Sequence, residues 1–222
     1  MRFAKGLKAI LAVSILACAG SSYAAACGTG STPPSGGLNT TDMVINSISA
    51  TNCFGTFDSG SSSLATMQTY VNNNSSNFFG GGWTGVVKDD AGGGSTEGNN
   101  IFNGIQFALS ALGNNTFTLN LTDTNPSAPL NLPATFDLLG VLNGGNVDAA
   151  YFFDDILLDT SNNGSYTISF KNNGGQIPGL SHLDILVRDG RNTNVPEPGP
   201  LSLLAIGIMG FMWVRRRNQL NA

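Results

Sequence analysis

Thr116-Phe-Thr-Leu-Asn-Leu-Thr122 alternates apolar and polar side chains without interruption. Successive residues of a β-strand point to opposite faces of a sheet. The three apolar side chains of this stretch therefore share one face, while Thr118 and Asn120 lie on the other. The alternation predicts a half-buried strand of an antiparallel sheet.

Further short strands are predicted along the chain from the same period of two or from short apolar runs. They are expected at Met43–Ala50, Trp83–Lys88, Ile101–Ala111, Thr135–Leu142, Ala149–Leu158, Tyr166–Phe170 and Leu183–Arg188. In the predicted strand Ile101–Ala111, residues Ile101, Ile105, Phe107 and Leu109 are expected on one face. About eight strands of this kind predict an all-β fold, an antiparallel β-sandwich or jelly-roll-like domain.

Clusters of Asn and Gly separate these stretches, and both residues readily adopt the positive φ angles of tight turns. The clusters are Gly113–Asn115, Asn143–Asn146, Asn162–Gly164 and Asn172–Gly175. Among them, Asn163-Gly164 between two apolar runs is the strongest hairpin signal. Leu64–Val71, which follows three serines, predicts the one short helix.

Composition agrees with an exported β-rich protein. The chain has 222 residues with 29 glycines, and 41% of its residues are hydrophobic. Only 11% are charged, against about 25% in typical globular proteins. Between residues 27 and 194 there are four basic residues and thirteen acidic ones. This acidic body would repel phosphate groups, so nucleic acid is not expected as a partner.

Residues 1–26 have the organisation of a secretory signal peptide. The basic residues Arg2, Lys5 and Lys8 precede the apolar run Ala9–Ala19, and the small residues Ala24–Ala26 follow. Ile15–Cys18 resembles a lipoprotein box, but Leu16 fits that box poorly. We therefore expect passage through the Sec translocon and cleavage by signal peptidase near Ala26. A buried N-terminal helix is the alternative interpretation.

Removal of residues 1–26 leaves two of the three cysteines, Cys27 and Cys53. Two thiols in an oxidising compartment predict one disulfide, with two free thiols as the alternative. Closing this loop would stabilise the fold by about 3 kcal/mol. The Gly-, Ser- and Pro-rich residues that follow Cys27 predict a flexible arm over 27–42.

No catalytic constellation is evident in the sequence. His182 is the only histidine, so zinc and Ser-His-Asp hypotheses would both depend on it. It comes just before the predicted strand Leu183–Arg188, and its side chain is expected on the face opposite the apolar residues of that strand. The preferred interpretation is a structural histidine that bonds to a turn backbone. No HxxxH, CxxC or GxSxG spacing occurs. The prediction is therefore a non-enzymatic protein without a cofactor or catalytic residues.

Clustered carboxylates provide the remaining routes to chemistry. Asp89-Asp90, and Asp154-Asp155 with Asp159, are the available groups. Adjacent carboxylates on a strand point to opposite faces, so neither dyad forms the pair that glycoside hydrolysis requires. Calcium would suit Asp89, Asp90 or Asp154, but no calcium-binding spacing is present. Solvated surface charge is therefore expected, and no metal site is predicted.

The C-terminal segment combines a Pro-rich elbow, an apolar run and three arginines. Leu201–Val214 has fourteen residues and would span about 21 Å as a helix. A stable transmembrane helix needs ~20 residues, so this segment is short. Arg215, Arg216 and Arg217 would remain cytoplasmic by the positive-inside rule and leave the body of the chain outside. A buried core helix is the alternative.

These three features together resemble the PEP-CTERM family of exported bacterial proteins. Val195, Pro196, Glu197 and Pro198 match the sorting motif, and the apolar helix and arginine cluster follow in the expected order. The resemblance implies recognition and cleavage by an exosortase-type membrane peptidase, followed by transfer to the cell envelope or extracellular matrix. Thr51–Gly55 and Gly179–Leu186 also resemble segments of secreted β-rich members of this family.

The chain is accordingly divided into six segments: signal peptide (1–26), flexible arm (27–42), β-sandwich (43–191), Pro-rich linker (192–200), transmembrane helix (201–214) and basic cytoplasmic tail (215–222). The favoured hypothesis is a cell-surface or matrix protein that resides briefly in the inner membrane. The alternatives are a carbohydrate-binding module of the exopolysaccharide matrix and a secreted glycan hydrolase. For the module, Trp83, Tyr151, Phe152 and Phe153 would supply stacking surfaces for sugar rings, although such aromatic residues more often lie in the core.

Overall fold

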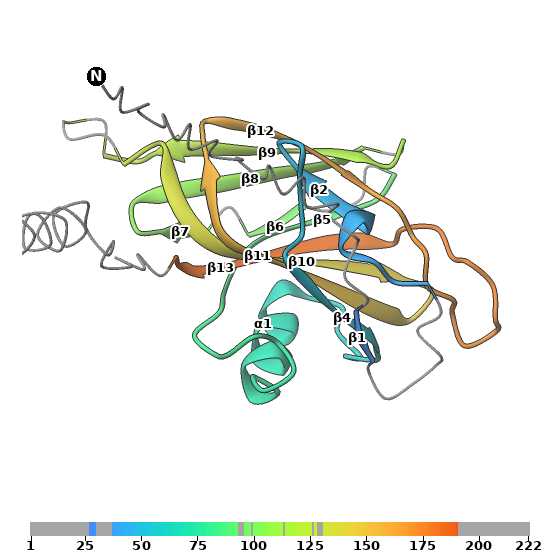
Figure 1. Cartoon of the computed structure of the whole chain (residues 1–222). Helices are drawn as coiled ribbons and strands as arrows, with labels where there is room; N and C mark the ends of the chain where they lie inside the picture. Colours follow the sequence, from blue (N-terminus) through green and yellow to red (C-terminus); the bar gives the residue numbers. More distant parts are fainter. Residues whose placement is uncertain are drawn as a thin grey trace, which may run out of the picture.

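The computed structural model describes residues 27–29, 37–92, 96–98, 100–112, 114–125, 127 and 131–190. Two β-sheets and one α-helix form three layers (Figure 1). The seven-stranded sheet has the order β1 (Gly28–Thr29), β4 (Asn52–Phe57), β11 (Val147–Leu158), β10 (Ala134–Gly144), β13 (His182–Asp189), β5 (Thr84–Asp90) and β6 (Thr96–Gly98). The six-stranded sheet has the order β3 (Ile48–Ser49), β2 (Met43–Ile45), β12 (Ser161–Tyr166), β9 (Thr116–Asp123), β8 (Ile105–Leu112) and β7 (Ile101–Phe102).

The predicted all-β sandwich is confirmed. Neighbouring strands are antiparallel throughout the described part of the chain, except that β1 runs parallel to β4. The structure has more strands than the sequence predicted because several are only two or three residues long. Two of the predicted strands are also divided by turns.

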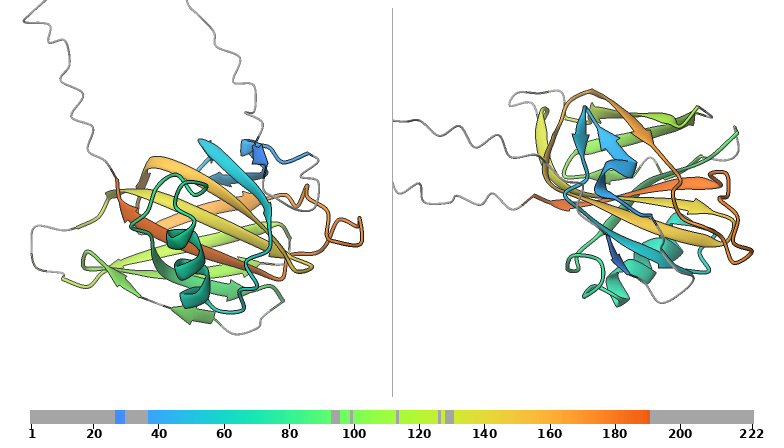
Figure 2. Two further views of the ribbon diagram at one scale, coloured as in Figure 1. Left: turned by 90° about the horizontal axis from the view of Figure 1, so that it is seen from below. Right: turned by 45° about the vertical axis from the view of Figure 1, so that its right-hand side comes forward.

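Two apolar cores hold the three layers together. The larger core lies between the sheets and includes Phe107, Phe117, Leu138 and Ile185. The second core lies where helix α1 (Leu64–Asn73) packs on the outer face of the seven-stranded sheet. Figure 2 shows this helix lying across the sheet on the side opposite the second sheet. The larger strands of this sheet are therefore buried on both faces.

Strand β9 has the alternating burial that its sequence predicted. Phe117, Leu119 and Leu121 are buried, while Thr116, Asn120 and Thr122 are exposed. β9 pairs with β8 on one side and β12 on the other. The six-stranded sheet thus has one face toward the core and one toward solvent, as expected for an antiparallel sheet.

Helix α1 is also confirmed, and it extends two residues beyond the predicted end to Asn73. Ser63 caps it by accepting a hydrogen bond from the Thr66 amide, as Ser commonly does at a helix start. Leu64, Met67 and Val71 are buried at the spacing of one helical face. The helix is therefore held by tertiary packing of this narrow stripe.

The predicted hairpin turn at Asn163-Gly164 is wrong. Both residues lie within β12, and the chain turns earlier, at Asp159 and Thr160, between β11 and β12. A Cβ atom at Gly164 would overlap the Phe117 ring on the neighbouring strand. Glycine at this position therefore serves the close approach of an aromatic side chain, a recognised role of glycine within strands.

Other strand predictions require smaller corrections. Met43–Ala50 is divided by a turn at Asn46 and Ser47, and Ile101–Ala111 by a turn at Asn103 and Gly104. Ile101 is 58% exposed and does not share the buried face of β8. Residues 167–170 do not continue the strand that ends at Tyr166. Strands β4 and β6 were not predicted, because their sequences lack a clear alternation.

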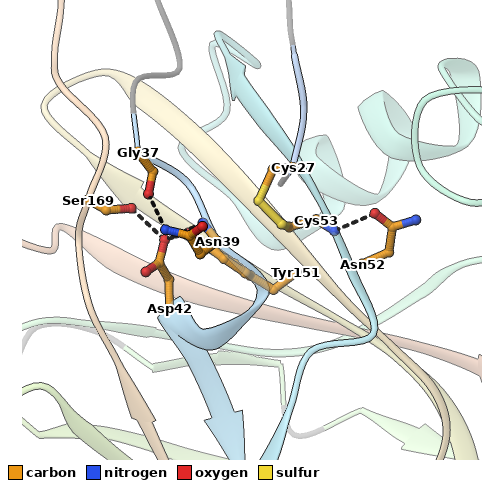
Figure 3. Close-up of a disulfide and its surroundings, with 8 residues drawn as sticks. All are labelled: Cys27, Gly37, Asn39, Asp42, Asn52, Cys53, Tyr151 and Ser169. Carbon is orange, nitrogen blue, oxygen red and sulfur yellow. Dashed lines mark hydrogen bonds between the residues drawn. A yellow bond between two sulfur atoms is a disulfide. The ribbon is translucent and has the colours of Figure 1, made fainter. Parts of the chain in front are cut away.

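The N-terminal residues are more closely integrated than a flexible arm. The predicted disulfide between Cys27 and Cys53 is present and joins the residue before β1 to β4 (Figure 3). Leu38, Thr40 and Asp42 are buried. The Asp42 carboxylate accepts hydrogen bonds from the Asn39 amide (2.9 Å), the Tyr151 hydroxyl (3.4 Å) and the Ser169 hydroxyl. The sandwich domain therefore includes residues 37–42, which the sequence had assigned to the arm.

The predicted signal peptide, Pro-rich linker, transmembrane helix and basic tail lie outside the described residues, as do the sorting-motif residues Val195–Pro198. Within the described ranges, no helix is long and apolar enough to cross a membrane.

Candidate functional site

The outer face of the seven-stranded sheet has an apolar centre and two polar ends. Strand register places Leu139, Ala150, Phe152 and Leu186 at the centre, where α1 covers them. At one end, Arg188 on β13 lies beside Asp137 on β10. The residues at the other end are Asp90, Asn143, Asp148 and His182, followed by Lys88 and Asp184. Four strands thus bring six polar residues together where α1 does not reach.

A cavity of 640 Å³ opens at this second end, and we call it the polar cleft. The sheet contributes Lys88, Asp90, Asn143, Asp148 and His182 to its wall. The loop before α1 contributes Asp58, Gly60, Ser61 and Ser62, and the remaining lining residues are Asn146, Asn173 and Ser181. Its volume lies within the range of about 300–1,000 Å³ that is usual for small-molecule sites.

Asp148 is fixed in the wall by three hydrogen bonds. Its carboxylate accepts the Ser59 hydroxyl at 2.6 Å, the Ser59 amide at 3.1 Å and the Asn143 side-chain amide at 2.6 Å. Burial raises the pKa of the Asp148 carboxyl above its ordinary value, although these hydrogen bonds act in the opposite direction. The network holds both the carboxylate and the Asn143 amide in one orientation.

Lys88 is a buried cation with acidic neighbours. Its ammonium group lies 2.6 Å from Asp90 and 3.7 Å from Glu97, and the residue is 3% exposed. Burial alone would lower the pKa of Lys88, but the Asp90, Glu97 and Asp184 carboxylates outweigh that effect and raise it. Lys88 therefore stays charged, and its charge is neutralised within the protein.

His182 and Asp184 form a second buried pair behind the wall of the cleft. The His182 Nε2 atom lies 3.4 Å from an Asp184 carboxylate oxygen, and the Asp184 side chain is 1% exposed. Within the described residues, neither oxygen of Asp184 nor Nε2 of His182 makes a hydrogen bond. Burial raises the pKa of the Asp184 carboxyl, while His182 and Lys88 oppose the rise.

The structure changes the interpretation of His182. Its Nε2 atom faces the Asp184 carboxylate, and the residue lines the polar cleft, two features that the sequence did not suggest. Of the carboxylates proposed from sequence, Asp90 lines the cleft, whereas Asp89, Asp154, Asp155 and Asp159 do not. No group of three or more His, Cys, Asp or Glu side chains in the described ranges is arranged to hold a metal ion.

Four residues in or behind the cleft wall were not predicted as site residues: Lys88, Asn143, Asp148 and Asp184. The signal that could have found them is strand register, because they become neighbours only when β5, β13, β10 and β11 are aligned. A single sequence does not provide that alignment.

The aromatic residues predicted to stack on sugar rings are all buried. Trp83, Tyr151 and Phe153 are at most 1% exposed, and Phe152 is 8% exposed. The Trp83 indole donates hydrogen bonds to the Phe78 and Gly80 carbonyls, both at 2.9 Å. These rings belong to the two cores, so the predicted stacking surface is wrong.

Comparison with known proteins identifies the C-terminal segment alone. A family model for the PEP-CTERM protein-sorting motif matches residues 194–217. The match includes the predicted motif residues Val195–Pro198 and the arginines Arg215–Arg217. No curated protein and no solved structure matches the chain.

Proposed function

We propose that this chain, which carries a PEP-CTERM sorting signal, is an exported, non-enzymatic protein of the cell surface or extracellular matrix. The signal marks the chain for export to the cell envelope and for processing by an exosortase, a membrane peptidase. On this proposal the β-sandwich is the delivered part. The apolar segment 201–214 holds it in the inner membrane until the peptidase cleaves near Val195–Pro198.

The position of the signal supports this proposal most directly. The last strand of the sandwich ends at Asp189, and the matched segment begins at residue 194. A cut near the motif would therefore remove the apolar segment and the arginines while leaving every described strand intact. The disulfide between Cys27 and Cys53 is consistent with an oxidising destination.

The chemistry of the polar cleft favours binding over catalysis. Asp90 is paired with Lys88, and Asp148 is held by Ser59 and Asn143. A glycoside hydrolase needs one carboxyl group free to protonate the leaving group and another free to act on the sugar. The internal partners instead hold Asp90 and Asp148 in place as hydrogen-bond acceptors, a role that suits binding. A polar cleft in an exported domain supports the carbohydrate-binding alternative, although not through the aromatic residues first considered.

Cell fractionation tests the sorting proposal. Replacement of Pro196, Glu197 and Pro198 by alanine should leave the protein in the inner-membrane fraction with its C-terminus intact. Alanine replacement of residues 191–193, immediately before the matched segment, is the control and should not change sorting. Release of the motif variant at the wild-type level would contradict the proposal.

The hydrolase alternative has a separate test. Asp148→Asn preserves the shape of the side chain but removes its charge. If the exported protein releases reducing ends from any polysaccharide and this variant does not, the non-enzymatic proposal is wrong. Equal and negligible release by both proteins is the expected result.

A further inference from the structure

The polar cleft has the properties of a built binding site. Its wall is formed by buried side chains that are fixed from behind, including Lys88, Asn143 and Asp148. Its rim is formed by exposed residues from three separate loops, among them Ser62, Asn146 and Asn173. Such preorganised polar groups reduce the ordering cost of binding a ligand.

Buried polar atoms at the wall that make no hydrogen bond within the described residues point to a ligand. The His182 side chain lines the cleft and is only 10% exposed, yet its Nε2 atom makes no hydrogen bond within the described residues. Both oxygens of Asp184, which lies behind the wall with one oxygen 3.4 Å from Nε2, also make no hydrogen bond within these residues. Buried polar atoms nearly always have hydrogen-bond partners, so a group that donates and accepts hydrogen bonds fits here.

The charges of the cleft limit the class of ligand. Asp58, Asp90 and Asp148 line it against one lysine, Lys88, whose charge Asp90 already neutralises. An anionic ligand would meet these carboxylates at close range and be repelled. The described residues also offer no cluster suited to a metal ion.

The remaining lining groups suit hydroxyls. Serine hydroxyls and asparagine amides both donate and accept hydrogen bonds, and carboxylates accept them. Sugar hydroxyls also do both, so a sugar can pair with this mixture without bringing a charge. Among the described residues no aromatic side chain lines the cleft, so a bound ring would be held by hydrogen bonds at its edge.

We propose that the polar cleft binds one or two units of an uncharged saccharide, held by the Asp90 and Asp148 carboxylates, His182 and the rim residues Ser62 and Asn173. This inference rests on the proposed non-enzymatic role at the cell surface, and it specifies the ligand and its site. It locates carbohydrate binding at the opposite end of the sheet from the Arg188–Asp137 pair and away from the buried aromatic rings.

Saturation-transfer NMR on the full-length protein, purified from membranes in detergent, tests the inference. The probes are methyl glucoside, methyl galactoside, methyl mannoside, maltose and cellobiose, with glucuronate and glucosamine as charged comparisons. We expect transfer to at least one neutral probe at concentrations of about 10 mM, since such sites bind weakly. Neither charged comparison should bind more tightly than that neutral probe.

Two variants locate the bound sugar. Ser62→Ala combined with Asn173→Ala removes exposed rim groups without disturbing the core, and should weaken binding about five-fold, as expected for lost hydrogen bonds. Asn114→Ala combined with Ser127→Ala removes the same groups at exposed positions outside the cleft and should leave affinity unchanged. Asp148→Asn, which keeps the side-chain shape, should also weaken binding.

Three results would overturn the inference: no transfer to any neutral probe, binding of only a charged probe, or neutral binding that the rim variant leaves unchanged. None of these results depends on sorting, which the fractionation experiment measures separately. A protein that is sorted correctly but binds no sugar would therefore reject this inference and leave the proposed function standing.

Discussion

Arg188 connects the second core to the polar end of the sheet opposite the cleft. Its guanidinium group lies 2.8 Å and 2.7 Å from the Asp137 carboxylate through two nitrogens. The same group lies 4.3 Å from the centre of the Trp83 ring. Asp137 is fully buried. One side chain thus neutralises a buried charge and covers an indole.

Arg188→Ala should therefore destabilise the fold strongly. It leaves the Asp137 carboxylate buried without its cation, a change that costs about 3–5 kcal/mol. Urea unfolding of the variant measures the loss. Lys171→Ala, at an exposed position, is the control and should change stability by less than about 0.5 kcal/mol. A loss no larger for Arg188→Ala than for the control would contradict the assigned role of Arg188.

Asp184 should give the fold a recognisable pH dependence. Because burial raises the pKa of its carboxyl in the folded state above the ordinary value of 3.8, this group stabilises the fold fully below that value. The contribution is lost as pH rises through the folded-state pKa.

Asp184→Asn removes this dependence. Relative to wild type, the variant should gain unfolding free energy between about pH 4 and pH 7, by about 1.4 kcal/mol for each pKa unit of the shift. Urea unfolding at the two pH values measures the gain. Asp58→Asn, at an exposed carboxyl in the cleft, is the comparison. If the gain for Asp184→Asn is zero or negative, burial does not raise the pKa of the Asp184 carboxyl.

Among the elements, β12 shows most clearly how packing overrides a local signal. Asn-Gly is typical of hairpin turns, yet here it continues a strand because Gly164 lies under the Phe117 ring. Gly164→Ala should therefore cost about 1–3 kcal/mol, the usual range for overpacking. Thermal or urea unfolding measures the cost.

Two other glycines provide controls for that substitution. Gly179 has no neighbouring atom within 4 Å of the added Cβ position, so Gly179→Ala should be nearly neutral. At Gly140 the added atom would overlap the end of the flexible Met43 side chain. Gly140→Ala should therefore fall between the other two. Equal stability of the Gly164 and Gly179 variants would contradict the packing explanation.

Strands β1 and β4 depend on the disulfide for part of their stability. Cys27 and Cys53 are 26 residues apart in the sequence, and losing a crosslink of this loop length costs about 3 kcal/mol in the chain-entropy estimate. The double substitution Cys27→Ser, Cys53→Ser should lower unfolding free energy by about that amount. Adding a reductant to the wild type should have the same effect and should not affect the variant. Insensitivity of the wild type to reductant would contradict the crosslink.

The elements that sequence could predict are those with a local signal. The alternation of apolar residues predicted β9, and the serines before Leu64 predicted α1. The oxidising compartment predicted the disulfide. Each of the three is confirmed. β4 and β6 could not be predicted because their strand character comes from pairing with β11 and β5. The polar cleft could not be predicted either, since its wall residues are separated along the chain and meet only through strand register. The buried positions of Trp83 and Tyr151 depend equally on the packing of α1 and the second sheet.

At the scale of the whole molecule, the proposed binding site and the sorting signal lie in separate parts of the chain. The described sandwich contains the cleft and both cores, whereas the sorting signal at residues 194–217 follows the last strand. Variants of the cleft should therefore leave sorting unchanged, and variants of the signal should leave sugar binding unchanged. This separation allows each proposal to be tested without the other.

Mass spectrometry of the protein recovered outside the inner membrane tests the central claim most directly. If the chain is an exosortase substrate, the recovered protein ends near Val195–Pro198 and lacks both the apolar segment 201–214 and the arginines Arg215–Arg217. It retains an intact peptide through Asp189, the end of the last strand. Recovery of protein that still carries Arg215–Arg217 would contradict the account.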